Sequence, residues 1–215
     1  YITGKNGGKA MSTIGQNPSG HQWVQQTSDN TLPTGIKAMS FHIKGGSNVF
    51  SNFSHIFDSR DSNMYVMYFS NNDLIFWNNS SSSGTASGSG YLPTGTQPRI
   101  YFNGVFQLYS SNNVNVGPQI GNITTTTLND GNWHHFYIEF PTTTSFTEIN
   151  WLTRAYGAYE TQGAIDDLRY FNEGLNDFQI KHLSNGGNAD LDFFNNLFYY
   201  ENFEDNSYTG SHTTA

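Results

Sequence analysis

The sequence has no cysteine, few charged residues and no long apolar run. The absence of cysteine excludes disulfide bridges and thiolate chemistry, although it does not identify a compartment. Because no apolar segment is long enough to cross a bilayer, we expect no membrane insertion. Lys and Arg number 9 against 17 Asp and Glu, which gives a net charge of −8. Nucleic-acid binding requires a basic surface, so this charge argues against nucleic acid as a partner.

Aromatic and small polar residues are abundant instead. The 215 residues include 17 Phe, 13 Tyr, 4 Trp and 22 Gly, together with many Asn, Ser and Thr. This composition is typical of aromatic β-strands joined by polar turns, and it lacks the residues that helices favour. No segment separates two domains, so we expect one all-β domain over residues 1–215. The chain begins at Tyr1, and we expect it to be part of a longer protein.

Strand signals recur along the chain. In Ile36–Lys44, successive side chains alternate in the period of two that places them on opposite faces of a sheet. Asn103-Gly104 separates two aromatic runs and predicts a hairpin, because both residues tolerate a positive φ. The turn Ser70–Asp73 predicts a second hairpin. The other expected strands are Phe53–Phe57, Met64–Phe69, Leu74–Trp77, Trp133–Phe140, Phe146–Leu152 and Leu197–Phe203.

One short helix is expected, over Asp177–Leu183. Asn176 is suited to the N-cap and Gln179 follows it by three residues, which is the spacing of a capping box. Two consecutive glycines, at 186 and 187, predict its end. Asp58–Asn63 is interpreted as a polar turn, because it lacks the glycine and terminal glutamate of a helix-loop-helix calcium loop.

Three segments resemble the laminin-G-like family, a branch of the concanavalin A-like lectin/glucanase jelly rolls. Gly163–Asn172 reads Gly-Ala-Ile-Asp-Asp-Leu-Arg-Tyr-Phe-Asn, and the closing strand of that family reads Gly-x-Ile-Asp-Asp-Val-Arg-Ile-Tyr. Leu175–Lys181 is similar to the short helix after that strand. Trp133–His135, after the turn Asn129–Gly131, resembles the Asp-Gly-x-Trp-His-His start of a central strand. The resemblance implies a two-sheet antiparallel jelly-roll β-sandwich with one short helix.

The order of the motifs departs from the family. Its usual opening strand, Tyr-x-Phe-Asp/Glu-x-Asn, is similar to residues 197–208 at the end of this chain. The resemblance therefore leaves two alternatives open. Either residues 197–208 supply a permuted first strand to this domain, or they begin the next repeat of a tandem array.

A calcium site is one implication of the resemblance. Related jelly rolls often place calcium between an Asp of the closing strand and an acidic residue of the opening strand, which here correspond to Asp166 and Asp205. Calcium takes six to eight oxygen ligands, and it would relieve the repulsion between nearby carboxylates. Such an ion would be structural. The alternative is that Asp166 or Asp167 pairs with Arg169 or caps a turn. The adjacent histidines His134 and His135 cannot share an ion, because neighbours on a strand face opposite ways.

Aromatic residues near the ends of expected strands, and in the segment before the closing strand, are candidates for glycan binding. Sugar sites combine aromatic rings for C–H faces with polar side chains for hydroxyl groups. A cluster before the closing strand and one residue at the end of a strand have this character: Trp151, Arg154, Tyr156, Tyr159 and Trp77. The alternative for this cluster is surface packing or an oligomer contact.

Catalytic motifs are not evident. Glycoside hydrolases of this fold carry several carboxylates at alternate positions of one strand. The nearest segment is Glu148–Leu152, in which Asn150 and Leu152 occupy the places of the second and third carboxylates. One carboxylate cannot act both as nucleophile and as acid, so we expect no enzyme activity.

The sequence thus favours a non-catalytic glycan-binding or adhesion module of a larger surface or fibre protein. Its expected location is extracellular, on a cell or virion surface, and its partner would be a glycan or cell-surface polysaccharide. Two alternatives remain. One is a structural or receptor-binding domain of a phage or viral fibre or decoration protein, with tandem repeats or homo-oligomers, and the other is a diverged polysaccharide-degrading enzyme.

Overall fold

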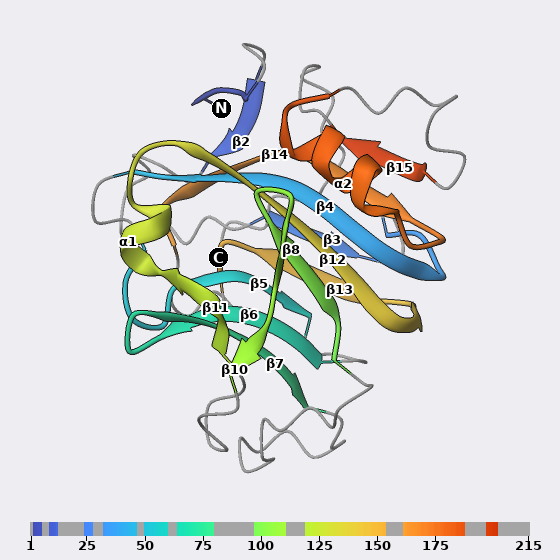
Figure 1. Cartoon of the computed structure of the whole chain (residues 1–215), viewed down its shortest axis with the longest axis horizontal. Helices are drawn as coiled ribbons and strands as arrows, with labels where there is room; N and C mark the ends of the chain where they lie inside the picture. The colour runs from blue at the N-terminus through green and yellow to red at the C-terminus, as the bar shows by residue number, and fades with distance from the viewer. Residues whose placement is uncertain are drawn as a thin grey trace.

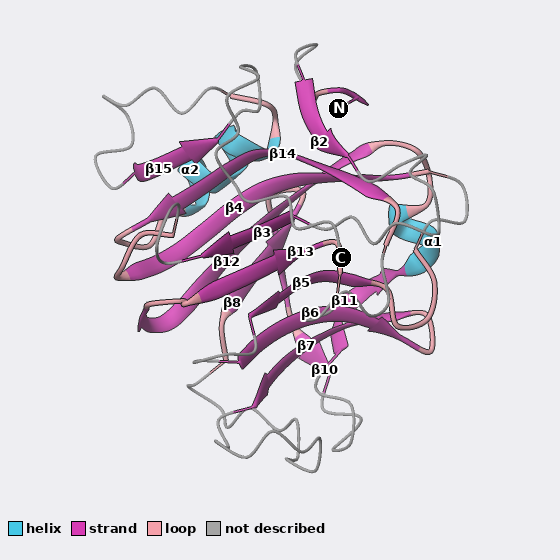
Figure 2. Cartoon of the chain, turned by 180° about the vertical axis from the view of Figure 1, so that it is seen from behind, coloured by secondary structure: helices cyan, strands magenta, loops and turns pink. Residues whose placement is uncertain are grey.

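The computed structural model describes residues 2–5, 9–12, 24–27, 32–46, 50–59, 64–79, 97–110, 119–153, 161–187 and 197–201. In this part of the chain, two antiparallel sheets stack face to face with the core between them (Figures 1 and 2). The expected all-β jelly-roll sandwich is therefore confirmed. No helix in the described ranges is long and apolar enough to cross a membrane.

The first sheet contains the segments that resemble the closing and central strands. Its order is β1 (Ile2–Thr3), β2 (Lys9–Ser12), β14 (Gly163–Phe171), β4 (Ile36–Gly45), β12 (Trp133–Thr144), β8 (Arg99–Phe102) and β9 (Val105–Gln107), with β15 (Leu197–Glu201) also paired to β14. The second sheet has the order β10 (Tyr109–Ser110), β11 (Gln119–Thr124), β7 (Asp73–Asn79), β6 (Met64–Ser70), β5 (His55–Ser59), β13 (Glu148–Trp151) and β3 (Val24–Thr27).

The core is formed by the inward set of each alternating strand. On β4, Met39, Phe41 and Ile43 are fully buried between the sheets, as their period of two predicts. The ring of Phe41 meets the ring of Trp151 from the opposite sheet edge-on, at 5.1 Å between centroids. Each such side chain contributes about 1.5–3 kcal/mol by leaving water, so the aromatic content of the sequence accounts for the stacking of the sheets.

Both predicted hairpins form, and their turns have the expected backbone geometry. Asn71 and Asn72 have φ angles of 51° and 72° between β6 and β7. Asn103 and Gly104 have φ angles of 49° and 75° between β8 and β9. Two consecutive positive φ angles match the right-handed twist of the flanking strands, and Asn and Gly adopt them at low cost.

Several strand boundaries differ from the expected ones, and two of them follow from the backbone conformation of one residue. Phe53 has a φ of 68°, so β5 begins only at His55 and extends to Ser59. Asp58 therefore lies in a strand and is fully buried, so its assignment to a polar turn was wrong. Leu152 has a φ of 57°, which ends β13 at Trp151. A left-handed residue breaks the pleat of a strand.

Helix α2 (Asp177–Ser184) covers part of the outer face of the first sheet. Its Ile180 and Leu183 pack with Tyr137 and Phe171 of β12 and β14 in a second apolar cluster. The predicted N-cap is confirmed, since the Asn176 side chain and the third helical residue form a reciprocal capping box. A second helix, α1 (Thr125–Leu128), was not expected, because four residues with three threonines carry no helical periodicity.

One edge of β14 is shared by strands from both ends of the sequence. β4 occupies the other edge along its length, while β2 pairs with Ala164 and Ile165, and β15 pairs with Leu168 to Phe171. Both β2 and β15 run antiparallel to β14, so they follow one another in the same direction along it (Figure 1). Residues 202–208 of the C-terminal motif lie outside the described residues.

Candidate functional site

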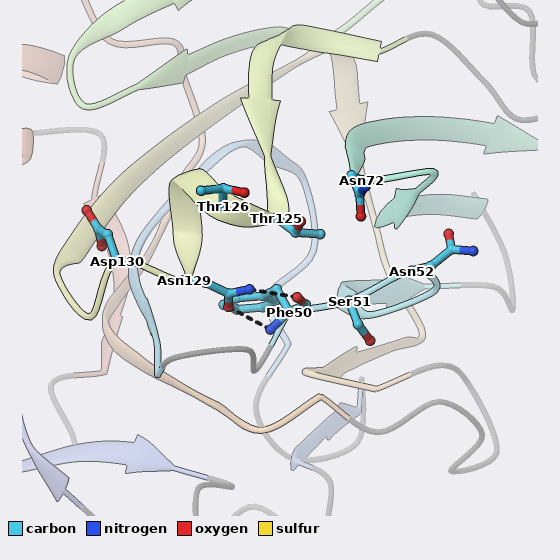
Figure 3. Close-up of a pocket in the computed structure, with 8 residues that line it drawn as sticks. All are labelled: Phe50, Ser51, Asn52, Asn72, Thr125, Thr126, Asn129 and Asp130. Atoms are coloured by element: carbon cyan, nitrogen blue, oxygen red, sulfur yellow. Dashed lines mark hydrogen bonds between the residues drawn. The ribbon is translucent and has the colours of Figure 1, made fainter.

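A polar pocket of about 490 Å³ opens at the end of the sandwich where α1 lies (Figure 3). It is built from three segments that are distant in the sequence: the segment between β4 and β5, the β6–β7 turn, and α1 with the turn after it. The lining residues are Phe50, Ser51, Asn52, Asn72, Thr125, Thr126, Asn129 and Asp130.

Hydrogen bonds hold these three segments together. The Asn129 side chain accepts the Phe50 N–H at 2.8 Å and donates to the Phe50 carbonyl at 2.7 Å, as Figure 3 shows. The Asn72 carbonyl accepts the Thr125 N–H at 2.9 Å and so joins α1 to the β6–β7 turn. The Asn52 side chain accepts the Asn71 N–H, also at 2.9 Å, and joins the first segment to that turn. These hydrogen bonds within the protein fix the relative positions of the three segments.

The inner wall of the pocket is apolar and closely packed. The Phe50 side chain is 2% exposed, and its ring lies 5.6 Å from that of Phe69 in the core. Gly45, at the end of β4, leaves room for this ring, since a Cβ there would lie only 2.6 Å from it. The wall cannot shift without disturbing the core, so the polar groups in front of it keep fixed positions.

The rim of the pocket offers uncommitted polar groups. Asn72 and Thr126 are exposed, and their side chains make no hydrogen bond in the part of the chain that the structure describes. Asn52 uses its carbonyl oxygen within the protein, whereas its amide nitrogen makes no hydrogen bond within those ranges. Amides and hydroxyls of this kind can exchange hydrogen bonds with the hydroxyl groups of a ligand.

Asp130 is the charged residue of the lining, and its carboxylate lies at one side of the pocket, pointing away from the other labelled side chains (Figure 3). Its Oδ1 accepts hydrogen bonds from the Asn132 N–H at 2.8 Å and from His134 Nε2 at 3.0 Å, and its Oδ2 accepts one from the Asn132 side chain at 2.9 Å. Partial burial acts to raise the pKa of the Asp130 carboxyl, but these hydrogen bonds outweigh it and lower that pKa to about 2. The carboxyl is therefore ionised at neutral pH.

The hydrogen bonds also define the tautomer of His134. Asn103 Oδ1 accepts the His135 N–H at 2.9 Å, which directs the Asn103 amide nitrogen towards His134 Nδ1, 3.1 Å away. Since Asn103 donates there, Nδ1 accepts, and the proton of the imidazole lies on Nε2, facing Asp130. The imidazole thus connects Asn103 of the β8–β9 turn to Asp130.

Trp151, expected in a loop as an exposed glycan platform, lies elsewhere. It is the last residue of β13 and is 1% exposed, and its indole N–H donates to Gln26 Oε1 at 2.9 Å between the sheets. That assignment was wrong, because the indole is part of the core and unavailable to a ligand. Three further candidates from the same cluster, Arg154, Tyr156 and Tyr159, lie outside the described residues.

Trp77 lies away from the pocket, on the outer face of the second sheet. Pairing across β13, β5, β6 and β7 places Asn150, Asp58, Val66 and Trp77 in one row on that face. Trp77 is partly exposed, whereas Asn150 and Asp58 are fully buried. The structure thus separates Trp77 both from Trp151 and from the pocket residues.

Asp166 lies on β14 and is 4% exposed. Its Oδ2 accepts the Lys5 N–H at 2.7 Å and its Oδ1 accepts the Asp167 N–H at 2.9 Å, so backbone donors satisfy part of its charge. In the described ranges no three His, Cys, Asp or Glu side chains are grouped as a metal ion requires. Asp205 lies outside these ranges. The residues described here do not form a calcium site by themselves, and the pair Asp166–Asp205 stays a prediction.

A second polar cluster lies buried on the outer face of the first sheet. His42 Nδ1 lies 3.4 Å from Asp167 Oδ2, and Arg169 Nη2 lies 3.5 Å from Asp167 Oδ1. The alternative in which Asp167 pairs with Arg169 is thus confirmed. His135 packs beside His42, at 4.9 Å between ring centroids, and its Nε2 lies 2.8 Å from the Ser40 hydroxyl. Burial lowers the pKa of both His42 and His135.

The sequence analysis did not identify the pocket. In the sequence, its residues predict only turns, because they belong to short polar segments. These are the Asn71-Asn72 pair, the threonines of 124–127 and the segment Asn129-Asp130. A concentration of Asn, Thr and Asp in several turns is a signal that several loops could present ligand-binding groups. Nothing in the local pattern indicates that these particular turns meet.

The chain was compared with known proteins. No known protein family matches the sequence, and no curated protein matches it either.

Proposed function

We propose that this domain is a non-catalytic glycan-binding or adhesion module of a larger extracellular surface or fibre protein, and that the polar pocket is its binding site. The proposal depends on the pocket itself, where amide and hydroxyl side chains from three segments line one hollow. The resemblance of the closing strand to laminin-G-like domains supports the same class of function.

The chemistry of the pocket suits a sugar. A sugar ring presents many hydroxyl groups that both donate and accept, and Asn72, Thr126 and Asn52 offer amide and hydroxyl groups of both kinds. Because the segments are already joined by hydrogen bonds, binding costs little conformational entropy. The pocket is open and its rim exposed, which suits the end or the side of a long polysaccharide.

A glycan array followed by calorimetry tests the proposal. We expect binding to at least one glycan class, and a loss of about tenfold or more in affinity when Asn72 is replaced by Gly, which keeps the positive φ of the turn, and Thr126 by Ala, since each lost hydrogen bond costs about 0.5–1.5 kcal/mol. The matched control replaces Asn172 by Gly and Thr143 by Ala. Asn172 lies just after β14 and Thr143 near the end of β12, and both are exposed and outside the pocket lining. Incubation with the same polysaccharides should release no reducing sugar.

The proposal fails if no glycan binds across a broad panel with calcium present. It also fails if the Asn72→Gly, Thr126→Ala variant binds as tightly as the wild type, because the ligand then contacts another surface.

A second candidate function is a structural role in a fibre or array, and exposed apolar residues beside β9 favour it. Val105, Phe106 and Leu108 are 62%, 47% and 73% exposed at the edge of the first sheet. In the described residues no strand pairs with the outer edge of β9, so its backbone can accept a strand from a second copy. Sedimentation equilibrium tests this: a defined oligomer that Leu108→Asp converts to monomer supports it, and a concentration-independent monomer contradicts it.

A further inference from the structure

The two buried histidines on the outer face of the first sheet carry an inference that does not depend on the proposed function. His42 on β4 and His135 on β12 lie opposite each other in the strand register, and each is 1% exposed. His42 Nε2 and His135 Nδ1 make no hydrogen bond in the part of the chain that the structure describes. We infer that ordered water is bound to these two nitrogens inside the protein.

The protein itself leaves these nitrogens without a partner. His135 Nε2 lies 2.8 Å from the Ser40 hydroxyl, and His42 Nδ1 lies 3.4 Å from Asp167 Oδ2. These contacts fix which way each ring faces, so turning a ring over would disturb one of them. Nearly all buried polar side-chain atoms in proteins have a partner, and an unsatisfied one costs more free energy than immobilising a water molecule does.

The chemistry of the site favours water over an ion. Each ring nitrogen either carries a hydrogen or offers a lone pair, depending on the tautomer and the charge of the ring. Water both donates and accepts, so it complements either form, whereas a metal ion requires a lone pair and an anion requires a hydrogen. A set of three His, Cys, Asp or Glu side chains that could hold a metal ion is absent from the described residues.

The bound water joins two pairs of residues into one polar network. The Ser40–His135 contact connects β4 to β12, and the His42–Asp167 contact connects β4 to β14. The centroids of the two imidazole rings are 4.9 Å apart, so one water molecule or two adjacent ones can link the rings. The network then extends across three neighbouring strands, β14, β4 and β12.

A high-resolution crystal structure of the wild type tests this inference. We expect density for water within about 2.7–3.2 Å of His42 Nε2 and of His135 Nδ1. This density should give no anomalous signal, either in native crystals or in crystals soaked with bromide. Elemental analysis of the protein should find no metal in a stoichiometric amount.

Variants assign the water to the rings. In His42→Leu, the water at the position of Nε2 should be lost, because the variant has no polar atom there. His182→Gln changes an exposed histidine of α2 and should keep the water in place. The wild-type crystals alone decide the question if His42→Leu does not fold.

Two results would overturn the inference. One is a wild-type structure in which both nitrogens contact protein atoms directly or have no density beside them. The other is an anomalous peak next to the rings, since the partner of the histidines would then be a metal ion or an anion.

Discussion

At the scale of single residues, Asp167 decides the geometry of β14. It has a φ of 53° in the middle of a strand, and the pairing with β4 shifts register between Asp166 and Arg169. This bulge adds one residue, so Arg169 and Phe171 face outward after it. The left-handed conformation costs free energy in a residue with a side chain, and the buried contacts to His42 and Arg169 hold it in place.

The buried histidines make stability depend on pH. Burial lowers the pKa of His42, although Asp167 acts in the opposite direction, and burial lowers that of His135 further below the ordinary value of 6.5. Below pH 6.5 the unfolded chain therefore binds protons that the folded chain does not. Above that pH, the two histidines should leave the free energy of unfolding unchanged. Below it, we expect each histidine to lower the free energy of unfolding by up to about 1.4 kcal/mol per pH unit.

Urea unfolding at about pH 7.5 and about pH 5.5 measures this dependence. The variants His42→Gln and His135→Gln should each reduce the difference in free energy of unfolding between the two conditions by about 1 kcal/mol or more. The control is His182→Gln on the exposed side of α2. If all three variants show the same pH dependence of the free energy of unfolding, the two buried histidines are not its cause.

Asp166 is expected to stabilise the fold through its backbone contacts. In Asp166→Asn, one oxygen becomes an NH₂ group that faces the N–H of Lys5 or Asp167, so the free energy of unfolding should fall by about 1–3 kcal/mol. Urea unfolding in the presence of a chelator measures this loss. A rise in Tm with calcium that both Asp166→Asn and Asp205→Asn abolish would support the predicted calcium site.

At the scale of elements, β15 is expected to contribute to this sandwich. It supplies hydrogen-bonding partners to β14, and Leu197 packs on the cluster around Phe171 and α2. Truncation after Gly187 should therefore lower the free energy of unfolding by at least about 2 kcal/mol and the Tm by roughly 4–8 °C. Thermal unfolding followed by circular dichroism provides the measurement.

The matched control is truncation after Glu201, which keeps β15 and removes only the residues C-terminal to it. If truncation after Gly187 leaves the Tm unchanged, residues 197–208 are better interpreted as the start of a next repeat. If truncation after Glu201 preserves the Tm and truncation after Gly187 does not, the permuted first strand is the better interpretation.

Elements with a local signal were predictable from the sequence. Examples are the two hairpin turns, Asn71-Asn72 and Asn103-Gly104, and the N-cap Asn176. Each depends on residues within a few positions, so the local sequence is sufficient to predict it. Helix α1 has no such signal, since its threonines are helical because the Thr124 cap and the neighbouring β6–β7 turn hold them.

At the scale of the whole molecule, the sequence predicted the class of fold but not which segments meet. Alternating aromatic strands require a second apolar layer, so a sandwich follows from composition and period. The pocket depends on contacts such as that of Asn129 with Phe50, 79 positions away, and the burial of Trp151 depends on Gln26, 125 positions away. No local pattern encodes these distances, which is why the expected glycan residues and the observed pocket differ.

The shared edge of β14 has a consequence for protein engineering. Because β15 leads in the direction of β2, a short peptide from Glu201 to Lys9, in place of β1 and of the residues after β15, could close the backbone into a ring without reversing either strand. Opening that ring within the serine-rich stretch at 80–90 would then give a reordered chain in which β15, the new peptide and β2 follow one another along the same edge of β14.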